Sequence, residues 1–233
     1  MKSVLSFIMG LIRENWYTRS FKRNLEIYRN PEIILSDSPR TFLIRVAKSY
    51  FLFMGTYLIY ALLVSLLNWE RLQHLRQSLT PFFKRGLLGW SFYYSSVYPY
   101  NIFYMLTLIL LFQIYFAATS YIALWFLGEE KRSFYRILGI TFTSSLFFVL
   151  ALFPISLLYS VMPNSVQGDI FKTIYFLSLV GAFGLAGFFT QAFLFIRMCK
   201  KVFAQNFGRA FLTWFFPLFI FSSFLYNVLA GKK

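Results

Sequence analysis

Carboxylates, the single histidine and the single cysteine are the side chains on which acid–base, nucleophilic or metal-assisted catalysis would depend. The eight carboxylates all lie in terminal segments or in loops between long apolar stretches: Glu14, Glu26, Glu32, Asp37, Glu70, Glu129, Glu130 and Asp169. Ion-coupled carriers generally keep ionisable groups inside the membrane bundle, and metal-dependent enzymes of lipid head groups need clustered carboxylates. The sequence therefore predicts neither class of protein, and it predicts no metal site and no cofactor.

The histidine and the cysteine lack the neighbours that catalysis requires. His74 has no second histidine or metal-ligand pattern near it, which indicates a surface residue. Cys199 cannot form an internal disulfide, and one thiol is too few for a structural zinc site. An unmodified thiol is the simpler interpretation, with palmitoylation as the alternative. We predict that the chain is not an enzyme.

Lysines and arginines are numerous and point to anion binding. The chain has 23 of them against 8 acidic residues, a net charge of +15. They flank the apolar stretches instead of clustering on one surface that could bind nucleic acid. The net charge therefore does not require a nucleic-acid partner. We expect contacts with anionic lipid, at about 1 kcal/mol per residue near the bilayer, or with a protein partner at the cytoplasmic face. The candidates are Arg13, Arg19, Lys22, Arg23, Lys131, Arg132, Lys200 and Lys201.

The elements that position these side chains are membrane helices. Hydrophobic residues make up 58% of the chain and charged residues only 13%, which is too apolar for a soluble domain. Windows of about 20 apolar residues cross a bilayer. We predict an all-α polytopic bundle with about five spans, at residues 49–67, 102–127, 137–160, 173–196 and 210–230, in one membrane domain over residues 41–233.

Small residues are concentrated in the fourth predicted span. Their three- and four-residue spacing lets a neighbouring helix approach closely, either within the bundle or from another chain. The predicted packing residues are Gly181, Ala182, Gly184, Ala186 and Gly187.

The distribution of lysine and arginine predicts the orientation. With the amino terminus inside, the cytoplasmic segments hold 16 of these residues and the opposite side holds 7. Such a bias is what the positive-inside rule requires. We therefore expect a cytoplasmic amino terminus and, with five spans, a carboxyl terminus on the other side.

Residues 1–40 are expected to form a basic amphipathic segment on the cytoplasmic side. Nine apolar residues from Val4 to Ile12 are too few to span, and no pair of small residues marks a signal-peptide cleavage site after them. Ser38 and Pro39 are typical of a helix start, with Ser at the cap and Pro in the first turn.

The loop between the first two spans ends in an aromatic-rich stretch, residues 81–100. Aromatic rings with polar edges partition to the headgroup layer. We interpret the stretch as a half-buried interfacial helix, with a re-entrant segment as the alternative.

The stretch Gly128-Glu-Glu-Lys-Arg-Ser-Phe-Tyr-Arg-Ile-Leu-Gly, followed by an apolar helix with Pro154, resembles the Yip domain family of Ypt-interacting membrane proteins. The short basic link through Phe207, Gly208, Arg209 and Ala210 is similar to the connection in that family's closing helix pair. The resemblance covers roughly residues 30 to 230 and supplies no catalytic residues. It implies a bacterial-type member of uncharacterised role, for which the inner membrane is the favoured location. The acidic-Leu-Tyr-Gly-Pro signature of the eukaryotic branch is absent before the first span. A eukaryotic member would be a trafficking adaptor of ER or Golgi membranes.

Two functions follow from these features. The first is a non-enzymatic adaptor, scaffold or accessory subunit of a membrane complex, with membrane lipids and a protein as partners. The alternative is a permease-type subunit that handles lipid or another hydrophobic molecule. No Gly-x4-Gly-Lys-Ser/Thr motif occurs, so a permease would take its energy from another chain.

Overall fold

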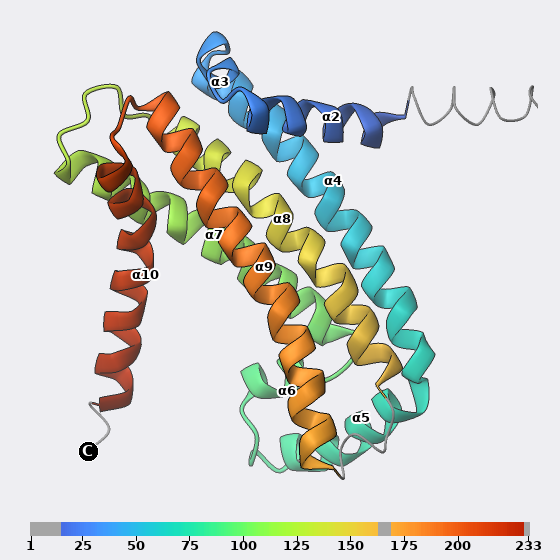
Figure 1. Cartoon of the computed structure of the whole chain (residues 1–233). Coiled ribbons are helices and arrows are strands. Elements are labelled where there is room, and N and C mark those ends of the chain that lie inside the picture. The colour runs from blue at the N-terminus through green and yellow to red at the C-terminus, as the bar shows by residue number, and fades with distance from the viewer. Residues whose placement is uncertain (1–14, 163–168, 231–233) are drawn as a thin grey trace, which may run out of the picture. The chain divides into compact units, whose positions relative to one another are not determined.

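The computed structural model describes residues 15–162 and 169–230, and all regular secondary structure in these ranges is helical. The elements, shown in Figure 1, are α2 (Trp16–Arg29), α3 (Ile33–Ser36), α4 (Pro39–Ser65), η1 (Leu66–Asn68), α5 (Trp69–Lys84), α6 (Trp90–Ser96), α7 (Tyr100–Phe126), α8 (Phe134–Val161), α9 (Ile170–Val202) and α10 (Phe207–Ala230). The predicted amphipathic run over residues 4–12 and Arg13 lie outside the described residues.

Within the described ranges, five helical segments are long and apolar enough to cross a membrane, as the sequence predicts. They are Pro39–Lys84, which contains α4, η1 and α5, and then Tyr100–Phe126, Phe134–Val161, Ile170–Val202 and Phe207–Val228. An α-helix can cross lipid because it pairs most of its backbone polar groups internally. The protein is an all-α polytopic integral membrane protein.

The helices are longer than the predicted spans. α4 begins at Pro39, ten residues before the predicted start at residue 49, and α9 continues to Val202 instead of residue 196. A hydropathy window finds the hydrocarbon-crossing part of a helix, whereas backbone hydrogen bonding continues into water. The predicted start at Ser38 and Pro39 is confirmed, because the Ser38 hydroxyl accepts a hydrogen bond from the Thr41 amide at 3.3 Å.

The prediction of one helix over residues 81–100 is wrong in extent, because this region holds the last turn of α5, all of α6 and the first residue of α7. α5 ends at a turn around Gly86, whose φ of +71° is readily adopted only by glycine. The amides of Gly86 and Leu87 donate to the carbonyls of Phe83 and Phe82, each at 3.0 Å, which is the pattern of a Schellman stop. α6 then folds back on α5, and the rings of Phe83 and Tyr93 stack with centroids 4.3 Å apart.

The chain divides into two compact units, of which the first is formed by the described parts of residues 1–52, 115–144 and 192–233. Its core holds Tyr50 stacked on Phe142, with ring centroids 4.8 Å apart. A side chain at Gly139 would overlap the ring of Phe42, so glycine allows α4 and α8 to approach closely here. This unit contains α2 and the polar connections described below.

The second unit comprises residues 53–114 and the described part of residues 145–191. Polar side chains join its helices. The hydroxyls of Tyr57 and Ser156 lie 2.6 Å apart, and the Ser145 hydroxyl donates to Oε1 of Gln113 at 2.7 Å. Hydrogen bonds of this kind stabilise helix association in lipid by about 0.6 kcal/mol each.

Candidate functional site

α2 is fixed to the membrane helices of the first unit by hydrogen bonds from its inner face. Nδ2 of Asn24 donates to the Ser49 hydroxyl on α4 at 2.8 Å, and both residues are buried. The phenol of Tyr28 donates to the carbonyl oxygen of Thr143 on α8 at 2.8 Å. Burial raises the pKa of the Tyr28 phenol, so it remains a donor at physiological pH. α2 therefore runs across the first turns of α4 in a defined position (Figure 1).

The carboxyl-terminal end of α2 is also tied to α9. Lys201 pairs with Glu32 at 3.0 Å, and the Arg197 guanidinium donates to the carbonyl oxygen of Arg29 at 3.0 Å. Close by in the sequence, Asp37 forms an ion pair with Arg45 of α4. These contacts hold the segment that connects α2 to α4, which contains α3, against the carboxyl-terminal end of α9. α2 is therefore attached to the membrane helices at this end as well.

A groove of about 440 Å³ lies between α2 and the first turns of α4. Five basic side chains and one carboxylate line it, a net charge of +4, and Trp16 contributes an aromatic surface that is 60% exposed. Among the described residues Arg45 has the Asp37 partner, but the other four basic side chains have no ion-pair partner. Those four are Arg19, Lys22, Arg23 and Lys48. The groove is therefore an electropositive surface that its one lining carboxylate neutralises only in part.

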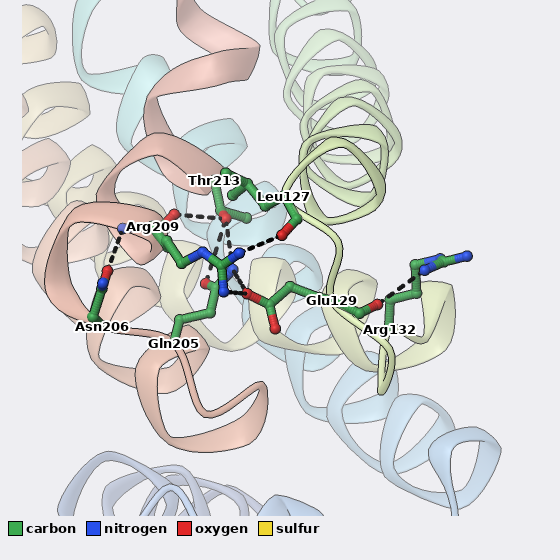
Figure 2. Close-up of polar contacts among 7 residues, drawn as sticks. All are labelled: Leu127, Glu129, Arg132, Gln205, Asn206, Arg209 and Thr213. Carbon is green, nitrogen blue, oxygen red and sulfur yellow. Dashed lines mark hydrogen bonds and ion pairs between the residues drawn. The ribbon is translucent and has the colours of Figure 1, made fainter.

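A second polar cluster joins the loop between α7 and α8 to the connection between α9 and α10 (Figure 2). α7 ends at Gly128, whose φ of +71° is again the left-handed stop conformation. The next residue, Glu129, has a side chain that is only 12% exposed and pairs with Arg209 at 3.2 Å. Arg209 also donates to the carbonyl oxygen of Leu127 at 2.6 Å, which caps the end of α7.

Two further side chains complete this cluster, as Figure 2 shows. Nε2 of Gln205 donates to Oε1 of Glu129 at 3.2 Å, and the Thr213 hydroxyl donates to the carbonyl oxygen of Arg209 at 2.9 Å. Gln205 and Thr213 are both buried. The cluster brings together the two stretches on which the resemblance to the Yip family rests, and its hydrogen bonds and ion pair connect side chains of the protein itself.

The cations proposed from the sequence do not form one site. The groove is lined by Arg19, Lys22 and Arg23. Lys201 lies elsewhere and forms an ion pair with Glu32. In separate places, the guanidinium of Arg132 donates to the carbonyl oxygen of Glu129, Lys200 lies over the ring of Phe207, and Lys131 is exposed on the same loop as Arg132.

Sequence reasoning missed the residues that complete the groove and the cluster. Arg45, Lys48 and Trp16 belong to the groove, and Glu129, Gln205 and Thr213 to the cluster. One signal was present, because the three- and four-residue spacing of Arg19, Lys22 and Arg23 places them on one face of a helix. No comparable signal connects Glu129 with residues 205–213.

The small residues of α9 differ in their surroundings. A Cβ atom at Gly187 would lie 2.8 Å from Cβ of Ala151 on α8, so the predicted close approach occurs there. At Gly181 and Gly184 a Cβ atom would meet nothing within 4 Å. Ala182 and Ala186 are exposed. Among the small residues predicted for packing in α9, Gly187 is therefore the one at which the structure shows a close helix contact.

No group of three or more His, Cys, Asp or Glu side chains that would hold a metal ion occurs in residues 15–162 or 169–230. Cys199 is fully buried, and His74 is exposed on α5. No protein-family model, curated protein or solved structure matches the chain.

Proposed function

We propose that this protein is a non-enzymatic membrane adaptor or accessory subunit that binds an acidic segment of a soluble protein in the groove between α2 and α4. The observation that carries the proposal is a set of four cations without an ion-pair partner among the described residues, which line one groove beside a helix fixed by hydrogen bonds: Arg19, Lys22, Arg23 and Lys48. For a eukaryotic member, the resemblance to the Yip family implies a trafficking adaptor.

The composition of the groove favours a protein partner over the bilayer surface alone. Tryptophan and arginine are the residues most enriched where binding energy concentrates in protein interfaces. Here an exposed Trp16 lies beside Arg19 and Arg23. The buried hydrogen bonds of Asn24 and Tyr28 order α2 before any partner arrives, which lowers the entropic cost of association. Complementary charge would also accelerate encounter with an acidic partner.

We propose that this end of the protein faces the cytoplasm. The 16 to 7 distribution of lysine and arginine supports this orientation, because it includes the cations of α2 and of the loops after α7 and α9. A bacterial inner membrane is the location that we favour, with ER or Golgi membranes as the eukaryotic alternative.

Affinity purification of the tagged full-length chain from its native membrane in mild detergent tests the proposed function. The test variant carries Arg19→Gln, Lys22→Gln and Arg23→Gln. The matched control removes three cations that lie elsewhere, with Arg76→Gln, Lys84→Gln and Arg85→Gln. We expect a soluble protein with an acidic segment to copurify stoichiometrically with the wild type and the control, and to be lost from the test variant and at high salt. Equal recovery with all three proteins, or no copurifying protein at all, would refute the proposal.

A further inference from the structure

A cavity of about 330 Å³ lies inside the second unit, where α4 passes through η1 into α5. α6, α7 and α8 complete its wall. Its volume is within the range of small-molecule sites, which begins at about 300 Å³. None of its lining residues belongs to the groove between α2 and α4, so this site does not depend on the proposed adaptor function.

The lining of the cavity includes hydrogen-bond donors and carries a single charge. Arg71 is the one charged side chain in the lining, and no carboxylate faces it. Arg71 is partly buried and has no ion-pair partner among the described residues. The amides of Asn68 and Asn101 and the hydroxyl of Ser96 share this lining, whereas the Ser160 hydroxyl donates to the carbonyl oxygen of Ser156 at 2.9 Å. A guanidinium with amide and hydroxyl donors around it matches the oxygen atoms of a carboxylate or phosphate group.

Apolar side chains also line the cavity. Leu152 and Ile155 of α8 and Met105 of α7 face the cavity, and these helices are membrane spans. Free inorganic anions gain nothing from such a wall, whereas an alkyl chain is stabilised by about 0.8 kcal/mol for each CH₂ group that it buries. The lining of the cavity therefore combines one cation and several hydrogen-bonding groups with apolar side chains of membrane-spanning helices.

We propose that the cavity binds an amphiphile with one acidic head, a carboxylate or a phosphate monoester, which pairs with Arg71 while the alkyl chain lies against α8. Zwitterionic lipids fit less well, because their ammonium group would approach the Arg71 charge without a carboxylate to receive it. The Tyr57 hydroxyl, bonded to Ser156 at 2.6 Å, also lines the cavity beside the apolar surface.

The test is a competition assay on the purified full-length chain in a non-ionic detergent, with a fluorescent fatty acid as the probe. Oleate and lysophosphatidic acid should displace the probe, and lysophosphatidylcholine should not. Arg71→Gln should weaken probe binding about tenfold or more, since it removes charge-assisted hydrogen bonds. Arg71→Lys should retain part of the affinity, and Arg85→Gln, at the exposed end of α5, should leave it unchanged.

A second variant keeps the test decisive if Arg71→Gln fails to fold, as judged by size-exclusion chromatography. Ser96→Trp fills the cavity without removing Arg71, and it should abolish probe binding. Displacement of the probe by acetate or inorganic phosphate at the same concentrations would assign the cavity to a soluble anion and overturn the proposal. Unchanged binding in both Arg71→Gln and Ser96→Trp would overturn it as well.

Discussion

Gly181 and Gly187 lie on the same helix, but only Gly187 is required for packing. The Cα atom of Phe148 would be 3.3 Å, and Cβ of Ala151 2.8 Å, from a methyl group at Gly187. Neither neighbour is the flexible end of a long side chain. At Gly181 the same methyl group would have open space.

Replacing Gly187 by alanine should therefore destabilise the protein by about 1–3 kcal/mol, the usual cost of overpacking a close contact. Thermal unfolding in detergent, followed by circular dichroism, measures the effect. Gly181→Ala and Gly184→Ala are matched controls on the same helix and should leave the unfolding temperature unchanged or slightly higher, because alanine has the better helix propensity. Equal destabilisation by all three substitutions would show that Gly187 has no special contact.

The sequence showed that α9 contains small residues at helical spacing. It did not show which of these residues contacts α8. Successive three-residue steps rotate around an α-helix by about 60° relative to a full turn, so Gly181, Gly184 and Gly187 drift across its surface. Which of them faces α8 depends on the relative rotation of two helices, and no spacing in the sequence specifies that rotation.

At the scale of elements, the loop between α7 and α8 is anchored by Glu129, whereas its neighbour Glu130 has no ion-pair partner among the described residues. The ion pair with Arg209 and the hydrogen bond from Gln205 both use Oε1 of Glu129. Removing the charge leaves the loop, which contains Lys131 and Arg132, without its main attachment to α10.

Glu129→Gln should increase the rate of trypsin cleavage after Lys131 or Arg132 in folded protein, and a double-mutant cycle with Arg209→Gln should give a coupling of about 1 kcal/mol. Limited proteolysis and thermal unfolding provide the two measurements. Glu130→Gln removes the same charge one residue away and should change neither. Identical cleavage rates for the two variants would contradict the role of Glu129.

The sequence was sufficient to predict which long helices exist. It was not sufficient to predict most of the residues at which helices end or the contacts between helices. Long apolar windows identified all five spans, and Ser38 with Pro39 identified the start of α4. The division of residues 81–100 was missed because Gly86 was not recognised as a left-handed helix stop. α2 has a helical pattern of its own, but its docking depends on Asn24 meeting Ser49, 25 residues away.

At the scale of the whole molecule, charge is distributed unevenly along the chain. The amino-terminal 48 residues carry 9 of the 23 lysines and arginines. Composition alone predicted this excess, but not that α2 would be held across α4 so that Arg45 and Lys48 join the cations of α2. The proposed adaptor function rests on that convergence.

Photo-crosslinking in native membranes tests most directly whether the groove lined by the cations of α2 and α4 binds a protein partner. p-Benzoylphenylalanine replaces Ser20, which lines the groove, in one variant and Gln77, on α5, in the other. We predict that irradiation links one soluble protein with an acidic segment to position 20 but not to position 77, and that Arg19→Gln, Lys22→Gln and Arg23→Gln together abolish the adduct. Adducts with lipid alone at position 20, or a protein adduct that survives the loss of these three charges, would contradict the account.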